Sequence, residues 1–165
     1  MVTNKDYVSI LLHDDQKRIL LQKRDDTPDF AGWRTFGGKV DLGEIFYESV
    51  VRETSEELAY DLNLLHPVHH MSYSNQKSSG NWHFFMHYIP ESDKSKLQLL
   101  EGCDWGWFSV ENAKKFTEIK KWGSLIPRLE GYMEEGKFLE ERLLPLYHSW
   151  SCLLYTSDAA DEEDS

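Results

Sequence analysis

The sequence predicts an α+β sandwich, in which a β-sheet packs against helices. Strand-like apolar runs occupy the first forty residues and the middle of the chain, and a helical segment without Gly or Pro lies between them. Strands that surround one central helix and are followed by late helices are typical of this class. With 165 residues, 40% of them hydrophobic, the chain is long enough for one domain with a real core.

The N-terminal part predicts a β-hairpin followed by a loop. Apolar runs at 7–12 and 18–23 flank the polar turn 14–17, as in two strands joined by a short connection. Residues 25–34 contain both Pro and Gly and predict a loop. The next run, 35–40, contains two adjacent glycines, where the backbone can approach another group very closely.

The central segment, 44–58, predicts a helix. Phe46, Val50 and Thr54 recur at helical spacing and are expected to face the core. Later in the chain the pattern predicts two strands, a polar loop between them, a charged loop, a short strand and C-terminal helices. Their ranges are 67–73 and 82–89 for the strands, 74–81 and 91–96 for the loops, 106–110 for the short strand, and 111–116, 125–135 and 137–147 for the helical segments.

The central helix has a concentration of carboxylates on one face. At 3.6 residues per turn, Glu53, Glu56 and Glu57 lie within an arc of about 100°. Carboxylates this close repel each other unless a cation neutralises them. Hard oxygen ligands at this spacing suit Mg²⁺, and Mn²⁺ as well. The alternative is a solvated helix face, because glutamates are common on protein surfaces.

Three further residues fit a metal site built on this helix. Glu44 lies eight residues before Arg52, on a similar helix face, so an ion pair between them would hold the helix and the preceding loop in register. A carboxylate at this position would also be stabilised by the positive N-terminal end of the helix dipole. Gly38 has no side chain, so its backbone carbonyl can approach the metal.

The segment from Gly38 to Tyr60 resembles the Nudix box. That motif is Gly, five residues, Glu, seven residues, Arg-Glu, an apolar residue, any residue, Glu-Glu, any residue, Gly and an apolar residue. Thr54 and Ala59 depart from it, at the aliphatic position and at the glycine that usually ends the helix. The matching positions are Gly38, Glu44, Arg52, Glu53, Glu56 and Glu57.

The resemblance covers roughly residues 7–116, because 20–26 and 32–38 are similar to the usual lead-in and 101–109 to the late strand region of the family. It implies the family fold, an α/β/α sandwich with a mixed sheet and a central carboxylate-bearing helix. It also implies a hydrolase of the Nudix type, which cleaves diphosphate linkages with bound Mg²⁺.

The resemblance also implies roles for the acidic residues. Glu53 and Glu57 are expected to bind the metal directly, and the Gly38 carbonyl to complete the inner shell. Glu56 is either a third ligand or the base that takes a proton from water. Glu101 is a second candidate for the base or an extra ligand, with a surface carboxylate as the alternative. Glu44 and Arg52 are expected to be structural.

Three residues are candidates for substrate contacts. Arg34 or Lys39 would contact phosphate, although either is also compatible with a solvated cation. Trp122 follows the short late helix, where relatives place residues that stack on a base. Core packing is the more common role for a tryptophan and is the favoured alternative.

The predicted reaction is Mg²⁺-dependent hydrolysis of a diphosphate linkage in a nucleoside diphosphate derivative. The first hypothesis is a nucleoside triphosphate, including an oxidised one, which would give a monophosphate and diphosphate. Nucleotide sugars and dinucleotides are alternatives within the same chemistry. A Nudix-fold ligand sensor without turnover is the alternative from another class, and the intact glutamates argue against it. A third hypothesis is isopentenyl diphosphate isomerase. That enzyme is expected to have a catalytic cysteine in a characteristic sequence context, whereas Cys103 is isolated here.

Composition argues against nucleic-acid and membrane partners and does not specify an oligomeric state, whereas the expected small-molecule partner is what the resemblance implies. The formal charge is −11, from 18 basic and 29 acidic residues, and this argues against nucleic-acid binding. No apolar run approaches the ~20 residues that span a bilayer. The two cysteines have no metal-type spacing, so a reduced, cytoplasmic setting is expected.

The C-terminal segment 152–165 differs abruptly from the rest. Its first residues, CLLYTSDAADE, are what a transposase-type sequencing adapter would encode, so we interpret the segment as a non-native, disordered tail after a single Nudix domain at 1–151. An acidic disordered tail is the alternative. The segment contains five acidic and no basic residues, so without it the charge falls from −11 to −6.

Overall fold

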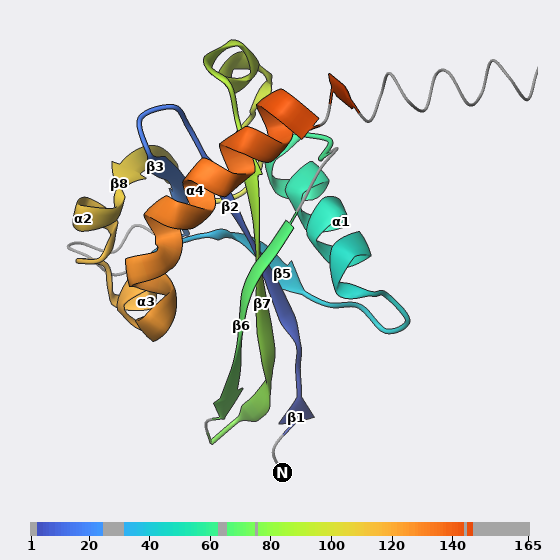
Figure 1. The fold of residues 1–165 in the computed structure, drawn as a ribbon. Coiled ribbons are helices and arrows are strands. Elements are labelled where there is room, and N and C mark those ends of the chain that lie inside the picture. The colour runs from blue at the N-terminus through green and yellow to red at the C-terminus, as the bar shows by residue number, and fades with distance from the viewer. Residues whose placement is uncertain (1–2, 25–31, 63–65, 75, 144, 147–165) are drawn as a thin grey trace, which may run out of the picture.

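The computed structural model describes residues 3–24, 32–62, 66–74, 76–143 and 145–146. A mixed sheet lies between helices on both faces (Figure 1), which confirms the predicted α/β/α arrangement. The strands are β1 (Thr3–Asn4), β2 (Tyr7–His13), β3 (Arg18–Lys23), β4 (Trp33–Arg34), β5 (Phe36–Lys39), β6 (His66–Ser74), β7 (Ser78–Tyr88) and β8 (Asp104–Ser109). The helices are α1 (Phe46–Leu58), α2 (Val110–Ala113), α3 (Thr117–Lys120) and α4 (Leu129–Phe138), with 3₁₀ helices η1 (Glu91–Lys96) and η2 (Gly123–Arg128) and a π-helical turn η3 (Leu139–Leu143).

β2 is the central strand of the sheet. It pairs in parallel with β7 over seven residues, from Tyr7 opposite Trp82 to His13 opposite Tyr88. Its other edge pairs antiparallel with β5. The predicted hairpin is confirmed, because β2 and β3 pair antiparallel across the turn, although their register is short, at His13 and Ile19. β5 takes the rest of that edge of β2, and β3 pairs mainly with β8.

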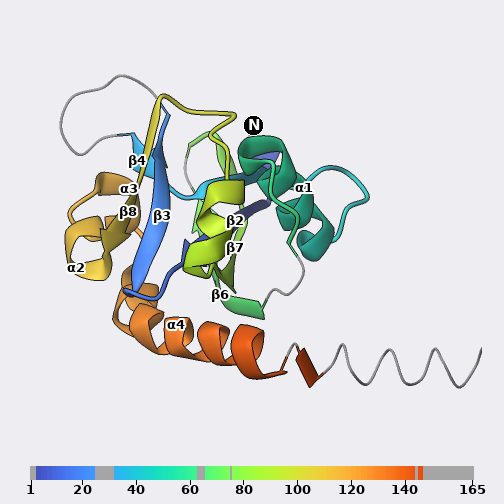
Figure 2. The ribbon, with the colours of Figure 1, turned by 90° about the horizontal axis from the view of Figure 1, so that it is seen from above.

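The two faces of the sheet have separate cores. Along β2, Val8, Ile10 and Leu12 point toward α1, while Leu11 points to the opposite face. This alternation follows from the period of two in a strand. Figure 2 shows α1 on one side of the sheet and α4 on the other. The first core also contains Phe36, Val50 and Leu58, and the second contains Ile19, Phe84, Met86, Trp122 and Leu129.

α1 begins at Phe46, two residues later than Glu44, so Glu44 lies in the preceding loop and does not open the helix. Of the three residues expected to face the core, Thr54 and Val50 are buried and Phe46 is half-buried. The helix ends at Leu58, and the C-cap residue Ala59 has φ 53° and ψ 35°. Glycine adopts this left-handed conformation without strain, which explains why the box usually has glycine there.

Several later elements differ from the prediction. Residues 78–81, expected in a polar loop, belong to β7, because Asn81 and its neighbours pair with the end of β6. The expected loop at 91–96 is the 3₁₀ helix η1. The helix expected from residue 125 is α-helical only from Leu129, because Pro127 lies in the preceding 3₁₀ helix η2.

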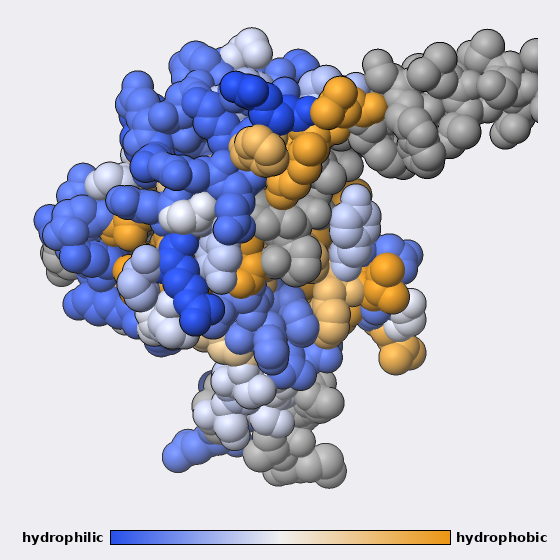
Figure 3. Space-filling view, viewed as in Figure 1, coloured by the Kyte–Doolittle hydropathy of each residue, from blue (hydrophilic) through white to orange (hydrophobic). Residues whose placement is uncertain are grey.

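Most of the surface in Figure 3 is hydrophilic, with apolar side chains over the C-terminal end of α4 and near the loop before α1. Leu42, Ile45 and Phe138 are among the exposed large apolar residues. No helix in the described ranges is long and apolar enough to cross a bilayer. The predicted tail at 152–165 lies outside the described residues.

Candidate active site

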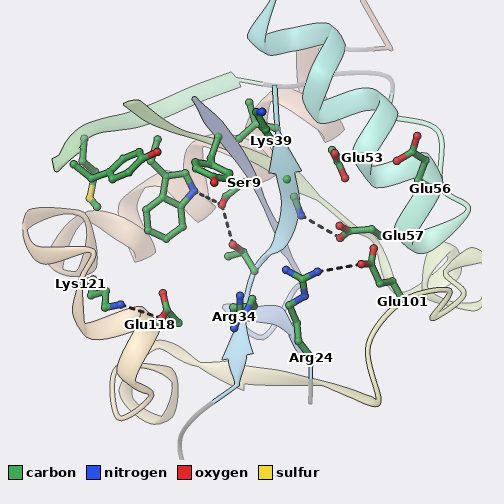
Figure 4. Close-up of a pocket in the computed structure, with 18 of the residues that line it drawn as sticks. Ser9, Arg24, Arg34, Lys39, Glu53, Glu56, Glu57, Glu101, Glu118 and Lys121 are labelled. Carbon is green, nitrogen blue, oxygen red and sulfur yellow. Dashed lines mark hydrogen bonds and ion pairs between the residues drawn. The ribbon is translucent and has the colours of Figure 1, made fainter. Parts of the chain in front are cut away.

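A cavity of about 860 Å³ opens beside α1 and β5 (Figure 4). α1 contributes Glu53, Glu56 and Glu57 to its wall, so the carboxylate face of the helix points into the cavity. Seven other residues were predicted to belong to the site. Gly38, Arg34, Lys39 and Glu101 line the cavity as well, whereas Glu44, Arg52 and Trp122 do not.

The paired glycines of β5 allow α1 to approach the sheet closely. Gly37 donates its backbone N–H to Oε2 of Glu57 over 3.1 Å. A Cβ atom at Gly38 would lie 2.5 Å from Oε1 of Glu53. Any side chain at Gly38 would therefore occupy the position of the Glu53 carboxylate. The two glycines and the two glutamates form one unit, which we call the glycine–carboxylate cradle.

Glu57 is the most buried carboxylate of the helix, with 3% of its surface exposed. Besides the Gly37 amide, Nε2 of Gln22 lies 3.4 Å from its Oε2. Burial, with the charges of Glu101 and Glu53, raises the pKa of Glu57 to about 8 despite the Gly37 hydrogen bond. Burial likewise raises the pKa of Glu53. The ionised form of both carboxylates is therefore disfavoured in the cradle, and a bound cation would stabilise it.

Arg52 joins the helix to the loop before it. Its Nε and Nη2 donate to the two carboxylate oxygens of Glu44 over 2.8 and 2.9 Å. Nη2 also donates to the backbone oxygen of Lys39 over 3.2 Å. The hydrogen bonds from Arg52 lower the pKa of Glu44 to about 2. This is the predicted ion pair, and it fixes the chain between β5 and α1.

The family model of the NUDIX domain matches residues 3–129, more than three quarters of the chain. The chain belongs to the NUDIX domain family. The Nudix box thus corresponds to β5, the following loop and α1. None of the curated proteins compared with the chain matches it.

Solved Nudix structures have the same fold. An Escherichia coli dihydroneopterin triphosphate pyrophosphohydrolase is 21% identical, with a TM-score of 0.63 and coverage of 82% of this chain and 99% of that one. A Caenorhabditis elegans Ap4A hydrolase is 22% identical, with a TM-score of 0.62 and coverage of 81% and 99%. A MutT protein from Methanosarcina mazei Go1 is 20% identical, with a TM-score of 0.61 and coverage of 79% and 96%.

The remaining carboxylates of the Nudix site have arginine partners. Arg52 donates to Oε2 of Glu56 over 3.2 Å and to Oε1 of Glu53 over 3.0 Å. Glu101 pairs with Arg24 over 3.1 Å. Within the described residues, no three His, Cys, Asp or Glu side chains already converge as a ligand cluster. The two arginines explain this arrangement, because each turns a carboxylate toward itself.

The donor set of the cradle nevertheless fits a hard divalent cation. It consists of carboxylate oxygens and a glycine backbone, which are the ligands that Mg²⁺ prefers. The side chain of Glu53 is only 14% exposed, so its carboxylate is already partly desolvated before an ion binds. A cation would also offset the burial, and the added repulsion from neighbouring carboxylates, that raise the pKa values of Glu53 and Glu57.

Trp122 is a core residue, so its predicted stacking on a base is corrected by the structure. It is 1% exposed and packs edge-on against Phe84 with ring centroids 5.5 Å apart. An aromatic wall does exist, but Trp82 of β7 provides it. Trp82 and Gln22 were missed because each lies within an apolar strand pattern. Arg24 was missed although it stands in the lead-in 20–26 that resembles the family.

Two glycine substitutions are expected to affect different properties: turnover in G38A and stability in G37A. In G38A the new methyl group displaces the flexible Glu53 carboxylate, so turnover falls by at least about 10²-fold while thermal stability changes little. In G37A the methyl group meets the backbone oxygen of Val8, and φ is +144°, so the free energy of unfolding falls by about 2 kcal/mol or more. Calorimetry and steady-state kinetics on both variants test this. Equal loss of stability in both would contradict it.

Proposed function

We propose that the protein is a Mg²⁺-dependent hydrolase of a diphosphate linkage in a nucleotide-like substrate, most directly a nucleoside triphosphate. The observation that supports this is the glycine–carboxylate cradle: Glu57 is buried against the Gly37 amide, and Glu53 fills the space that Gly38 leaves. Family membership supports the hydrolase assignment, because Nudix enzymes act on pyrophosphate bonds. The cradle supports the metal, because a bound cation would stabilise the ionised carboxylates that burial disfavours.

In this proposal Glu53, Glu57 and the Gly38 carbonyl hold Mg²⁺, with Glu56 as a further ligand. The bound ion would neutralise phosphate oxygens and favour attack by water. Glu101 accepts the proton from that water, because it lines the same cavity as Glu53 and Glu57.

Three cations that line the cavity are placed to bind the phosphates: Arg24, Arg34 and Lys39. Figure 4 shows Arg24 beside Glu101 and Arg34 near the middle of the cavity. Nε of Arg34 is buried without a hydrogen-bond partner among the described residues, so the guanidinium is not held by another group and its remaining nitrogens can turn to phosphate. Glu44 and Arg52 hold the loop in position and do not touch substrate.

The test is a panel of nucleoside triphosphates, nucleotide sugars and dinucleoside polyphosphates, incubated with Mg²⁺ in ¹⁸O-labelled water. Mass spectrometry of the products identifies the bond that breaks and the phosphorus atom that water attacks. We expect monophosphate and diphosphate from a triphosphate. Binding without turnover of any compound would overturn the proposal and favour the ligand sensor.

The metal should change how stability depends on pH. The pKa of Glu57 is raised to about 8, above its ordinary value of 4.5. Its contribution to stability is therefore fully present below pH 4.5 and is lost as pH rises through 8. We expect the melting temperature of metal-free protein to fall over this window, and Mg²⁺ to raise it more at pH 8 than at pH 6. Differential scanning calorimetry with EDTA or with MgCl₂ measures both.

An equal effect of Mg²⁺ at both pH values would contradict the prediction. The matched control is E57Q, which has no titrating group at this position and should show a weaker decline between pH 5 and 8. If the melting temperature of E57Q fell as steeply as that of the parent between pH 5 and 8, another group would be responsible for the pH dependence.

A further inference from the structure

We propose that Glu118 and Lys121 select a base that presents two adjacent N–H donors next to a carbonyl group. This edge belongs to 2-amino-6-oxopurines such as guanine and, in equivalent form, to pterins. The inference rests on the proposed function, because it assigns the substrate class of that same cavity.

Glu118 and Lys121 lie at the far end of the cavity from α1. Figure 4 shows Glu118 and Lys121 on one side of the cavity and the α1 carboxylates on the other, with Arg34 between them. Nζ of Lys121 donates to Oε1 of Glu118 over 3.0 Å. Phosphates held near Arg34 and Arg24 would therefore place the base of the same molecule toward α3.

The neighbouring helix α2 offers a comparison. Glu111 and Lys114 have the same spacing of three residues and pair over 2.6 Å, but they do not line the cavity. The side chain of Glu111 is 73% exposed, whereas that of Glu118 is 32% exposed. Glu118 is thus partly desolvated by its place in the cavity wall, and hydrogen bonds made there are stronger than on an open surface.

The cavity also has a rigid aromatic wall on which a ring can stack. Trp82, Tyr73 and Met71 line it. The indole N–H of Trp82 donates to Oγ of Ser9 over 2.6 Å, and the hydroxyl of Tyr73 donates to the backbone oxygen of Lys5 over 2.6 Å. These bonds fix both rings before a ligand arrives. The indole N–H is already used, so the wall supplies stacking and leaves hydrogen-bonding specificity to the α3 pair.

The chemistry of the pair limits which base fits. An ionised carboxylate only accepts hydrogen bonds, through two oxygens, and an ammonium only donates. Guanine presents N1–H and the 2-amino group as neighbouring donors, with O6 beside them as acceptor. Adenine, cytosine and uracil each place an acceptor where Glu118 requires a donor. A good bidentate contact discriminates by about 5- to 150-fold, so the expected preference is about 10-fold or more.

The experiment compares dGTP with dITP, which differ only in the 2-amino group, for the parent and three variants. We expect kcat/KM to favour dGTP by about 10-fold or more in the parent, and E118Q to abolish this preference. K121M breaks the same ion pair but keeps the carboxylate. It should therefore lower kcat/KM for both substrates and retain the preference for dGTP. E111Q, the matched control, should behave as the parent. A pterin triphosphate tested in parallel distinguishes the two sources of this edge.

A binding measurement separates this inference from the proposed reaction. Calorimetric titration with dGMP and dIMP is expected to show tighter binding of dGMP, lost in E118Q. Hydrolysis of dGTP and dITP at equal rates, unchanged in E118Q, would overturn the base selection and leave the hydrolase proposal standing. Preferential dGMP binding without hydrolysis of any triphosphate would support the base selection and overturn the reaction.

Discussion

Replacing Glu57 by glutamine is expected to lower kcat with Mg²⁺ by about 10³-fold or more, because the variant loses the charge at the centre of the glycine–carboxylate cradle. Glutamine keeps the shape of the side chain, and its oxygen can still accept the Gly37 N–H. The fold should therefore remain. Since burial raises the pKa of Glu57 to about 8, the neutral amide should even raise the melting temperature of metal-free protein at pH 8.

The control for this variant lies on the same helix. Glu48 in the first turn of α1 accepts the Ile45 N–H and does not line the cavity. E48Q should keep nearly full activity, with a small loss of stability. Steady-state kinetics and calorimetry on both variants give the comparison. Substantial turnover by folded E57Q would show that Glu57 is not a metal ligand.

Replacing Asp14 by asparagine is expected to lower the free energy of unfolding at pH 7 by about 3 kcal/mol, or about 6–12 °C in melting temperature. The Asp14 side chain is 0% exposed. Its Oδ2 accepts from both Arg18 and Lys94 over 2.9 Å, and its Oδ1 accepts from the backbone N–H of Arg18 over 2.9 Å. An amide group would turn a donor toward two cations.

The pH dependence identifies the cause of this effect. Burial acts to raise the pKa of Asp14, but hydrogen bonds from Lys94 and Arg18 outweigh it and hold the pKa below its ordinary value. The stabilisation is therefore present above pH 3.8 and is lost as pH falls through the lowered pKa. The difference in free energy of unfolding between D14N and the parent should therefore disappear in this acid range.

Glu134 is the matched control, because its side chain is 69% exposed and it forms a surface pair with Lys17. E134Q should leave the free energy of unfolding nearly unchanged at any pH, because a pair this exposed is screened by solvent. Denaturant unfolding from pH 3 to pH 7 measures all three proteins. A gap between D14N and parent that persisted unchanged at pH 3 would contradict the ionic explanation.

Elements with a strong local pattern were predictable, and the pairing of strands was not. The range of α1 followed from periodicity to within two residues. The partner of β2, by contrast, is β7, whose paired residues are 75 positions away in the sequence. Apolar alternation is the same for any partner, so it could not reveal that β5 displaces β3 from the edge of β2.

The candidate site divides in the same way. Spacing along one helix was enough to place Glu53 and Glu57 together, and the structure brings Gly38 against Glu53 and Gly37 against Glu57. Residues that reach the cavity from other elements, such as Trp82 and Glu118, have no sequence relation to the box. Trp122 illustrates the converse: proximity in sequence to the late helix suggested a ligand contact, but its indole is enclosed by the second core.

The parallel pairing of β2 with β7 has a consequence during protein synthesis. Tyr7 must wait for Trp82 to be translated before the two strands can join. At 5–20 residues per second this interval is roughly 4–15 s. Meanwhile α1 has been made but has only part of its sheet to pack on, with Val8, Ile10 and Leu12 not yet covered by a complete fold. The nascent chain should therefore be most vulnerable to proteases and chaperone binding in this interval, and closure of the central strands should end that exposure.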